Sequence, residues 1–356
     1  MNLRQLAAHL GLSQTTVSRA LNGYPEVSEE TRRRVVEAAR AVGYRPNMRA
    51  RGLATGRAMA IGHVIPVSTR HEIVNPVFAD FIAGAGETYS QAGYDMVLSV
   101  VPDREVARAY REMKAKGNVD GFIVHGPKRD DARIPLLAEL GLPFVVHGRA
   151  SGVQTPYSWL DVNNRRAFVR ATDFLLDLGH RRIALLNGLE DMDFAIRRRE
   201  GYLTALQGRG IDPDPALMRS AEMTETYGHD AAEQMLNLPD PPTAFLASSV
   251  LIAMGVRRAI ETRGLRMGKD ISVVTHDDEL SYLGNGGADP LFTATRSSVR
   301  EAGRQAAAML LQLIANPQSG PVDRLLEAGL ILGRSTGPAP RPKSSAHRST
   351  TSEPGE

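Results

Sequence analysis

Residues 12–23 read Leu-Ser-Gln-Thr-Thr-Val-Ser-Arg-Ala-Leu-Asn-Gly and follow Gly11, where a helical run that begins at Leu3 ends. Ser13 suits the N-cap of a second helix, because its hydroxyl can accept a hydrogen bond from the first turn. The apolar spacing turns one face of this helix inward and leaves Gln14, Thr15, Ser18 and Arg19 outward. A helix, a glycine turn and a second helix predict a helix-turn-helix unit.

The outward side chains of this second helix suit the edges of DNA bases. Glutamine can pair with adenine, arginine with guanine, and a threonine methyl group can contact thymine. A small helical bundle with an incidental polar face fits the same pattern. Charge favours DNA, because residues 1–57 hold ten Lys and Arg against four Asp and Glu, whereas residues 58–336 hold 30 against 34.

The head resembles that of the lactose-repressor (LacI/GalR) family in residues 12–23, in Val27-Ser28 and Glu30-Thr31-Arg32, and in residues 43–47, Gly-Tyr-Arg-Pro-Asn. Residues 53–56, Leu-Ala-Thr-Gly, resemble the family's hinge. The resemblance implies that Leu53 inserts into the minor groove as a wedge. The DNA-contacting residues that we predict are Gln14, Thr15, Ser18, Arg19, Asn22, Tyr44, Asn47, Arg51 and Leu53.

Beyond the hinge, apolar runs of four to seven residues alternate with longer helical segments. The predicted strands are 60–66, 96–101, 121–125, 144–147, 183–187, 244–247 and 271–275. This alternation predicts parallel sheets with helices on both faces. The fold class is therefore α/β: an N-terminal helix-turn-helix head and a core of two doubly wound parallel-sheet subdomains. The resemblance implies that this core is like a periplasmic binding protein.

These patterns divide the chain into four parts. Residues 1–46 form the predicted helix-turn-helix DNA-binding head, and residues 47–57 the hinge helix or linker. Residues 58–336 form the effector-binding core, with the subdomain boundary near 161–180 and crossovers between the halves. Residues 337–356 are rich in Pro, Ser, Thr and Arg, which predicts a disordered tail.

A core of this kind is expected to hold a small molecule in the cleft between the carboxyl ends of its two sheets. By the resemblance, Arg198 and Asp277 hold the ligand, and a guanidinium with a carboxylate suits a polyhydroxylated molecule. The predicted effector-binding residues are Asn75, Phe78, His147, Trp159, Asn163, Arg198, Ser249 and Asp277.

Simpler interpretations exist for several of these residues. Arg198 lies in a run of three arginines that also fits a solvated surface, and Asp277 can belong to a loop turn. Trp159 fits the core as well as the pocket. Asn163 and Ser249 stand where this chain departs from the family's usual residues, so that side of the pocket is less charged than in relatives.

Other classes of protein lack support. The chain has no cysteine, which excludes disulfides, thiolate zinc sites and cysteine nucleophiles, and we predict neither a metal nor a cofactor. Phosphate-binding, metalloprotease and serine-hydrolase motifs are missing. The alternatives are an enzyme acting on sugars or nucleotides, and a regulator with a non-sugar effector or corepressor. With no export signal and no membrane-spanning apolar stretch, we expect a cytoplasmic protein.

The sequence therefore predicts a DNA-binding transcriptional regulator without enzymatic activity. A homodimer on a pseudo-palindromic operator is expected, because one helix-turn-helix contacts few bases. Residues 64–69, 145–149 and 157–159 resemble regulators of α-glucoside utilisation. By that resemblance, we expect a repressor of a sugar-utilisation operon that a small sugar, an α-glucoside, releases from DNA.

Overall fold

The computed structural model describes residues 2–21, 23–44, 57–66 and 75–340. The head contains α1 (Leu3–Leu10), α2 (Gln14–Leu21) and α3 (Glu29–Ala41). Their buried side chains form one small core: Leu6, Ala7, Val17, Ala20, Val35 and Ala39. Four predicted DNA contacts lie outside the described residues, namely Asn22, Asn47, Arg51 and Leu53.

Local hydrogen bonds begin the head's helices where the sequence predicts. The Ser13 hydroxyl accepts a hydrogen bond from the Thr16 amide at 3.0 Å, and Ser28 accepts one from the Thr31 amide at 3.3 Å. Gly11 ends α1 with a φ of 66°, a left-handed conformation that glycine adopts without strain. The helix-turn-helix is therefore set by short-range interactions.

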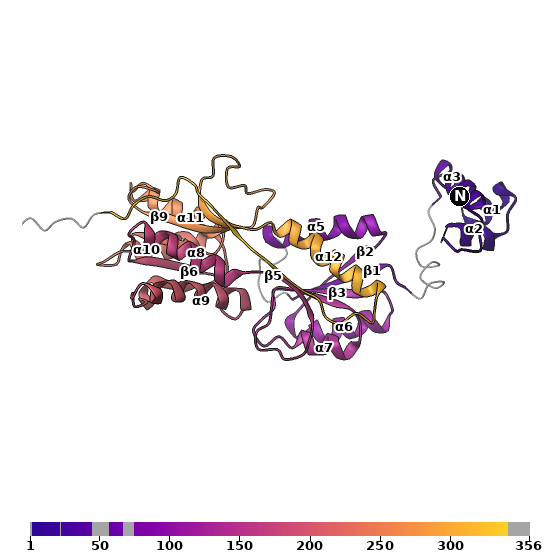
Figure 1. Ribbon diagram of the computed structural model, residues 1–356, viewed down its shortest axis with the longest axis horizontal. Coiled ribbons are helices and arrows are strands. Elements are labelled where there is room, and N and C mark those ends of the chain that lie inside the picture. The colour runs from indigo at the N-terminus through magenta and orange to yellow at the C-terminus, as the bar shows by residue number, and fades with distance from the viewer. Residues whose placement is uncertain (1, 22, 45–56, 67–74, 341–356) are drawn as a thin grey trace, which may run out of the picture.

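Two six-stranded sheets form the core (Figure 1). The first has the order β11-β5-β4-β3-β1-β2 with all strands parallel. Its strands are β1 (Ala60–Pro66), β2 (Asp95–Val101), β3 (Gly121–His125), β4 (Phe144–His147), β5 (Ser158–Val162) and β11 (Asp323–Leu326).

The second sheet has the order β12-β10-β9-β8-β6-β7 and is parallel except for its edge strand β12. Its strands are β6 (Ile183–Asn187), β7 (Met218–Ser220), β8 (Ala244–Ala247), β9 (Ser272–Asp277), β10 (Thr293–Arg296) and β12 (Gly329–Ile331).

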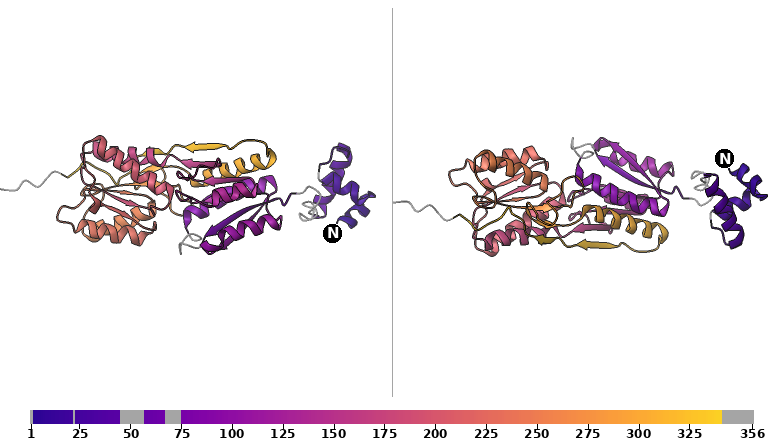
Figure 2. Two further views of the ribbon diagram at one scale, coloured as in Figure 1. Left: turned by 90° about the horizontal axis from the view of Figure 1, so that it is seen from below. Right: turned by 90° about the horizontal axis from the view of Figure 1, so that it is seen from above.

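Helices cover both faces of each sheet (Figure 2). On the first sheet, α5 (Pro76–Ala92) and α12 (Val299–Ala315) pack on one face, and α6 (Val106–Ala115) and α7 (Arg133–Leu140) on the other. On the second, α8 (Asn164–Asp177) and α9 (Asp193–Gly208) pack opposite α10 (Glu225–Leu236) and α11 (Val250–Thr262). Short 3-10 turns span Asp103–Glu105 and Pro215–Leu217.

The chain passes between the two subdomains repeatedly. It crosses from β5 to α8, returns from β10 to α12, and crosses again from β11 to β12 (Figure 1). The first crossing leaves the carboxyl end of β5 and enters the amino end of α8. The carboxyl edges of the two sheets therefore border one cleft, which is where doubly wound folds bind ligands.

Glycines allow α5 and α12 to pack in direct backbone contact. A Cβ atom at Gly84 would lie 2.0 Å from the carbonyl oxygen of Arg300, and one at Gly303 would lie 2.2 Å from that of Phe81. No larger residue fits either position without moving a helix. This close contact ties α12, which returns from the second subdomain, to the first sheet.

The segment after residue 336 begins with ordered contacts. The Gly337 amide donates to the Ser272 hydroxyl at 3.1 Å, and the Ala339 amide donates to the Leu178 carbonyl at 2.8 Å. Residues 337–340 thus pack on the second subdomain, although the sequence predicts a disordered tail from residue 337. The remainder of that tail, 341–356, lies outside the described residues. No described helix combines the length and apolar character that a membrane span needs.

Candidate functional site

A cavity of about 450 Å³ lies between the carboxyl edges of the two sheets. The first subdomain lines it with residues at the ends of β1, β3, β4 and β5 and at the start of α5. The second lines it with residues at the end of β9, on α9, and in the loop before α10. Its volume falls in the range of small-molecule sites.

Arg198, on α9, is the cavity's buried cation, with 6% of its surface exposed. Its Nε donates to Asn164 Oδ1 at 2.7 Å, and its Nη1 donates to the Ser248 carbonyl. Burial lowers the pKa of Arg198 to about 10, with the carboxylates of Asp278 and Asp161 opposing the change. The guanidinium is therefore charged at neutral pH and held in one orientation before a ligand arrives.

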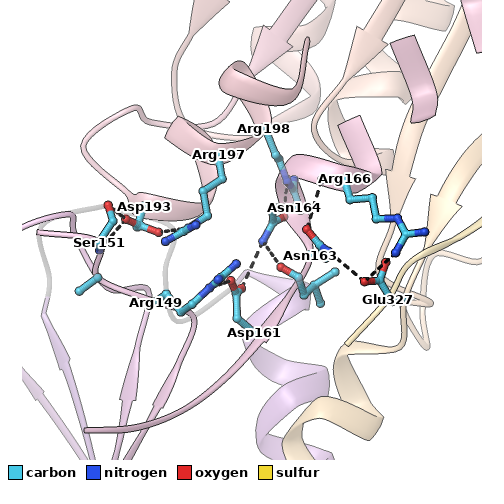
Figure 3. A network of polar contacts seen from close by, with 12 residues as sticks. Arg149, Ser151, Asp161, Asn163, Asn164, Arg166, Asp193, Arg197, Arg198 and Glu327 are labelled. Atoms are coloured by element: carbon cyan, nitrogen blue, oxygen red, sulfur yellow. Dashed lines mark hydrogen bonds and ion pairs between the residues drawn. The ribbon is translucent and has the colours of Figure 1, made fainter. Parts of the chain in front are cut away.

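A chain of polar contacts joins Arg198 to the first subdomain (Figure 3). Asp161, at the end of β5, accepts from Asn164 Nδ2 at 3.2 Å and from Arg149 Nε at 2.8 Å. Burial raises the pKa of Asp161, while Arg149 acts in the opposite direction. Asn164 opens α8, so the contact from Asp161 to Arg198 spans the crossover between the subdomains.

A second set of contacts joins loops of the first subdomain to the start of α9 (Figure 3). Buried Asp193 accepts hydrogen bonds from the Ser151 amide at 2.9 Å, from the Ser151 hydroxyl, and from Arg197. Exposed Lys128 and Asp191 form an ion pair at 2.8 Å. The contacts of buried Asp193 hold the two subdomains together beside the cavity, and the exposed ion pair lies at the same junction.

Histidines line the cavity from both subdomains. His147, at the end of β4, stacks on Phe81 with ring centres 4.2 Å apart, and burial lowers its pKa to about 4. His276, on β9, has polar neighbours at both ring nitrogens: its Nδ1 is 3.0 Å from Thr295 Oγ1 and its Nε2 is 3.5 Å from Asp278 Oδ1. Burial also lowers the pKa of His276. These imidazoles are neutral at neutral pH.

Asp278, which directly follows β9, is a carboxylate of the second subdomain in the cavity lining, as are Glu222 and Glu225. Burial acts to raise its pKa, but His276 and Arg198 outweigh burial and leave the pKa below its usual value. The cavity therefore offers a charged donor in Arg198 and a charged acceptor in Asp278, together with the rings of Phe78, Phe81 and Phe194.

Four of the predicted effector residues line this cavity: Asn75, Phe78, His147 and Arg198. Asn75 also caps α5, because its Oδ1 accepts from the Val77 amide at 3.0 Å. Phe78 meets His125 edge to face at 5.0 Å. Both residues belong to the start of α5, which points its amino end at the cavity.

Asp277 lies outside the cavity lining and its neighbour Asp278 lies within it. The Asp277 carboxylate accepts from the Glu279 amide at 2.9 Å and from Arg296 Nε at 3.1 Å. Successive side chains at the end of a strand point in opposite directions, so only one of two adjacent aspartates can reach the ligand.

Asn163 and Ser249 are helix caps that do not line the cavity. Asn163 accepts from the Arg166 amide at 3.2 Å and donates to Glu327 at 2.9 Å, whereas the next residue, Asn164, holds Arg198. Ser249 is buried and accepts from the Ile252 amide at 3.3 Å. In both cases the side chain satisfies the first turn of a helix.

Trp159 also lies outside the cavity lining. Its ring packs beneath the Arg149 guanidinium, 4.9 Å from the ring centre, and joins the apolar cluster under α6 and α7. Trp159 thereby supports Arg149, which in turn binds Asp161. Its place in the first sheet is a packing position.

Several cavity residues are not among those the sequence predicts as effector-binding. They are Asp161, Asn164, Asp278, Phe81, Phe194, His125 and His276, with the segment 222–225 before α10. Most follow the carboxyl end of a strand or open a helix. A position just after a predicted strand is the signal in the sequence that could have predicted these residues, because parallel strands present their carboxyl ends at one edge of the sheet.

In the head, the predicted base-reading face of α2 is accessible. Gln14, Thr15 and Arg19 are exposed, while Val17 and Ala20 are buried on the opposite face. Ser18 is half-buried. Tyr44 packs against the head's core, and burial raises its pKa.

Two family models match the chain. Residues 2–47 match the bacterial regulatory proteins of the lacI family, and residues 172–336 match a periplasmic binding protein-like domain. Among solved structures, a lac repressor dimer bound to operator and the anti-inducer ONPF is 27% identical, with a TM-score of 0.79 over 95% of this chain and 99% of that chain. A complex of the transcriptional regulator CelR with cellobiose is 29% identical, with a TM-score of 0.69 over 94% of this chain and 99% of that chain.

Relatives match over almost the whole length. The HTH-type transcriptional regulator AglR of Rhizobium meliloti (strain 1021) is 45% identical over 96% of this chain and 95% of that protein. The HTH-type transcriptional regulator RafR of Escherichia coli is 35% identical over 90% of this chain and 94% of that protein. With its head, its core and its full-length relatives all in agreement, the chain belongs to the lacI family of bacterial regulatory proteins.

Proposed function

We propose that this transcriptional regulator senses a small sugar in the cavity between its core subdomains. The observation that carries the proposal is the pairing of buried Arg198 with Asp278 in a cavity of about 450 Å³. A guanidinium donates and a carboxylate accepts, so together they suit both roles of a hydroxyl group. The rings of Phe78 and Phe194 offer apolar surface to the C–H face of a sugar ring.

An α-glucoside is the effector that we propose within this class. The segments 64–69, 145–149 and 157–159 resemble those of α-glucoside regulators, and His147 of the second segment lines the cavity. The similar CelR structure holds a sugar, cellobiose. In place of the predicted Asp277, we propose Asp278 as the effector-binding carboxylate, with Arg198, Asn75, Phe78 and His147.

The head is proposed to bind an operator as part of a homodimer. The accessibility of Gln14, Thr15 and Arg19 on α2 supports this proposal, in which these side chains contact base edges in the major groove. The similar lac repressor structure is a dimer bound to operator. Two heads related by symmetry require a pseudo-palindromic site, and the sequence adds Ser18, Asn22, Tyr44, Asn47, Arg51 and Leu53 as contacts.

The relatives are named as regulators, and we propose that this chain likewise has no catalytic role. Its place of action is the cytoplasm, where the operator lies. The sugar releases the regulator from DNA, because an operon for sugar use needs its substrate to end repression. Such release requires that the sugar bind the DNA-incompetent state more tightly than the DNA-competent state.

Calorimetry with maltose, sucrose and trehalose tests the effector, with cellobiose and lactose as β-linked controls. We expect one α-glucoside to bind and to weaken operator affinity by about 5- to 150-fold, the usual range of allosteric coupling. Binding of a β-linked sugar alone would contradict the α-glucoside proposal. If none of the five sugars binds at millimolar concentration, the effector is of another class.

A further inference from the structure

A chain of hydrogen-bonded side chains, the buried Tyr89 and His63 and the half-buried His125, runs from α5 through the first sheet to the cavity. Tyr89 Oη lies 3.2 Å from His63 Nε2, and His63 Nδ1 lies 2.9 Å from His125 Nε2. Tyr89 is 1% exposed and His63 is fully buried. His125 stands at the end of β3 and lines the cavity. The chain therefore connects the sheet interior with the ligand site.

Hydrogen-bond directions in this chain follow from Tyr89. Among the described residues, the Tyr89 hydroxyl has no hydrogen-bond partner other than His63. If Tyr89 accepted from His63, its own proton would be buried without an acceptor, which is the costly arrangement. Tyr89 therefore donates, and His63 Nε2 carries the lone pair.

The proton position on His63 then determines that on His125. A neutral imidazole has one N–H and one lone pair, so His63 carries its proton on Nδ1 and donates it to His125 Nε2. Burial lowers the pKa of His63 to about 3, which keeps the ring neutral at neutral pH. His125 accepts at Nε2, and its proton is placed on Nδ1.

His125 is neutral as well. Burial lowers its pKa, and His63, His147 and Arg133 act in the same direction. Phe78 and Phe81 each meet the His125 ring edge to face at 5.0 Å, so the ring is held between aromatic neighbours. No described residue takes a hydrogen bond from its Nδ1.

We propose that Tyr89 and His63 are positioning residues that hold His125 as a hydrogen-bond donor through Nδ1, so that the cavity selects effectors with an acceptor oxygen at the first-subdomain end. The proposal rests on the proposed function for the identity of the effector, but the proton position does not depend on it. Hydroxyl, ring and glycosidic oxygens satisfy such a donor. An ammonium group has only donors and is rejected there.

Long-range ¹H–¹⁵N NMR of the ligand-free protein with ¹⁵N-labelled histidine tests the proton position. The His63→Asn and His125→Asn variants assign the signals. We expect the His125 proton on Nδ1 in the wild type, and a loss of that preference in Tyr89→Phe. A proton on His125 Nε2 in the wild type would overturn the proposal.

Tyr110→Phe is the matched control, because Tyr110 is an equally buried tyrosine on α6 whose hydroxyl has no partner among the described residues. It should leave the His125 signal unchanged, and denaturant midpoints check that both variants are folded.

Maltose is the probe for the second measurement. We expect Tyr89→Phe to weaken maltose binding about tenfold, the effect of one misdirected hydrogen bond, while Tyr110→Phe binds like the wild type. Equal maltose affinity in Tyr89→Phe and the wild type would overturn the selective role. If the wild type binds sucrose or trehalose and not maltose, that sugar replaces maltose as the probe. If it binds none of the three, the proposed α-glucoside effector fails, while the NMR result still decides the proton position.

Discussion

At the scale of single residues, Asp277 and Asp278 are adjacent carboxylates with different partners. Asp278 lies in the cavity beside His276, whereas Asp277 binds Arg296 and the Glu279 amide. We expect Asp278→Asn to weaken binding of the α-glucoside about tenfold or more, since hydrogen bonds to charged groups contribute about 1.5–3 kcal/mol. Calorimetry measures the loss.

Asp277→Asn is the control for that substitution. It should bind the sugar like the wild type and unfold at lower denaturant concentration, because the contact with Arg296 is weakened. A loss of sugar binding in Asp277→Asn that equals the loss in Asp278→Asn would show that the cavity lining does not identify the effector carboxylate.

The buried histidines make stability depend on pH. The folded-state pKa of His63 is about 3, below the ordinary histidine pKa of 6.5 that applies to the unfolded chain, because burial disfavours the charged ring. The unfolded state therefore binds the extra proton as pH falls below 6.5. The contribution of neutral His63 to the free energy of unfolding is therefore complete above pH 6.5 and is lost as the pH falls toward 3.

Urea unfolding near neutral pH and near pH 5 measures this effect. His63 alone should cost about 2 kcal/mol at pH 5, since each pKa unit is worth about 1.4 kcal/mol. His125, His147, His180 and His276 have lowered pKa values and act with the same sign. Stability that rises on acidification would contradict the burial of neutral imidazoles.

At the scale of elements, the contact between α5 and α12 depends on glycine. Gly84→Ala places a Cβ atom 2.0 Å from the Arg300 carbonyl oxygen, so a helix must move. We expect a loss of about 1–3 kcal/mol or more in unfolding free energy, the cost of overpacking. Thermal or urea unfolding measures it.

Gly86→Ala, on the same helix, is the matched control. Its Cβ atom meets only Met96 Cε at 3.7 Å, which is ordinary contact. Alanine favours a helix by about 1 kcal/mol over glycine, so this variant should be as stable as the wild type or more so. Equal destabilisation by both substitutions would show that the close contact between α5 and α12 is not the reason for glycine at position 84.

Five strands of the described residues are not predicted from the sequence: the edge strands β7, β11 and β12, and the inner strands β5 and β10. The edge strands have only three or four residues each, and β7 and β11 are largely exposed, so none of the three forms a long apolar run. The inner strands β5 and β10 contain polar residues that interrupt the apolar pattern. Longer buried strands have the predicted bounds, as in β1 (60–66) and β6 (183–187). Strands that are covered on both faces by apolar packing form continuous apolar runs, and those runs are visible in the sequence.

At the scale of the whole molecule, Asp193 links the subdomains. It is buried and holds Ser151 of the first subdomain. We expect Asp193→Ala to separate the subdomains, to raise the radius of gyration of the ligand-free protein in X-ray scattering, and to weaken sugar binding. Each effect follows from the loss of contacts that hold the cleft closed.

Asp191→Ala removes an ion pair at the same junction and is the control. Asp191 and Lys128 are both about half exposed, and exposed ion pairs contribute little. This variant should match the wild type in scattering and in sugar affinity. An unchanged radius of gyration in Asp193→Ala would mean that the Ser151 contact does not hold the subdomains together.

Operator binding also belongs to this scale, because it requires two heads. Arg19→Ala should cost about 1–3 kcal/mol for each lost base contact and relax specificity at one base pair in each half-site. Affinity should fall steeply with salt as counterions are released from phosphates. Fluorescence anisotropy with operator DNA measures both, and affinity that does not change over a tenfold range of salt would contradict DNA binding by this head.

The sequence alone determined the helix-turn-helix, the caps at Ser13 and Ser28, and the alternation of buried strands with helices. These features depend on residues a few positions apart, so composition and periodicity are enough to predict them. The sequence also predicted four effector-binding residues that the structure brings into one cavity: Asn75, Phe78, His147 and Arg198.

Only the tertiary structure decided which of two neighbouring side chains lines the cavity. Asp278 lines the cavity and its neighbour Asp277 does not; likewise Asn164 lines the cavity and its neighbour Asn163 does not. In each pair the two side chains point in different directions, because they are successive residues at the end of a strand or the start of a helix. In the hydrogen-bonded series Tyr89, His63 and His125, the first two residues are 26 positions apart in the sequence and the last two are 62 positions apart. Such contacts depend on the pairing of strands and the packing of helices distant along the chain, and no local pattern encodes them.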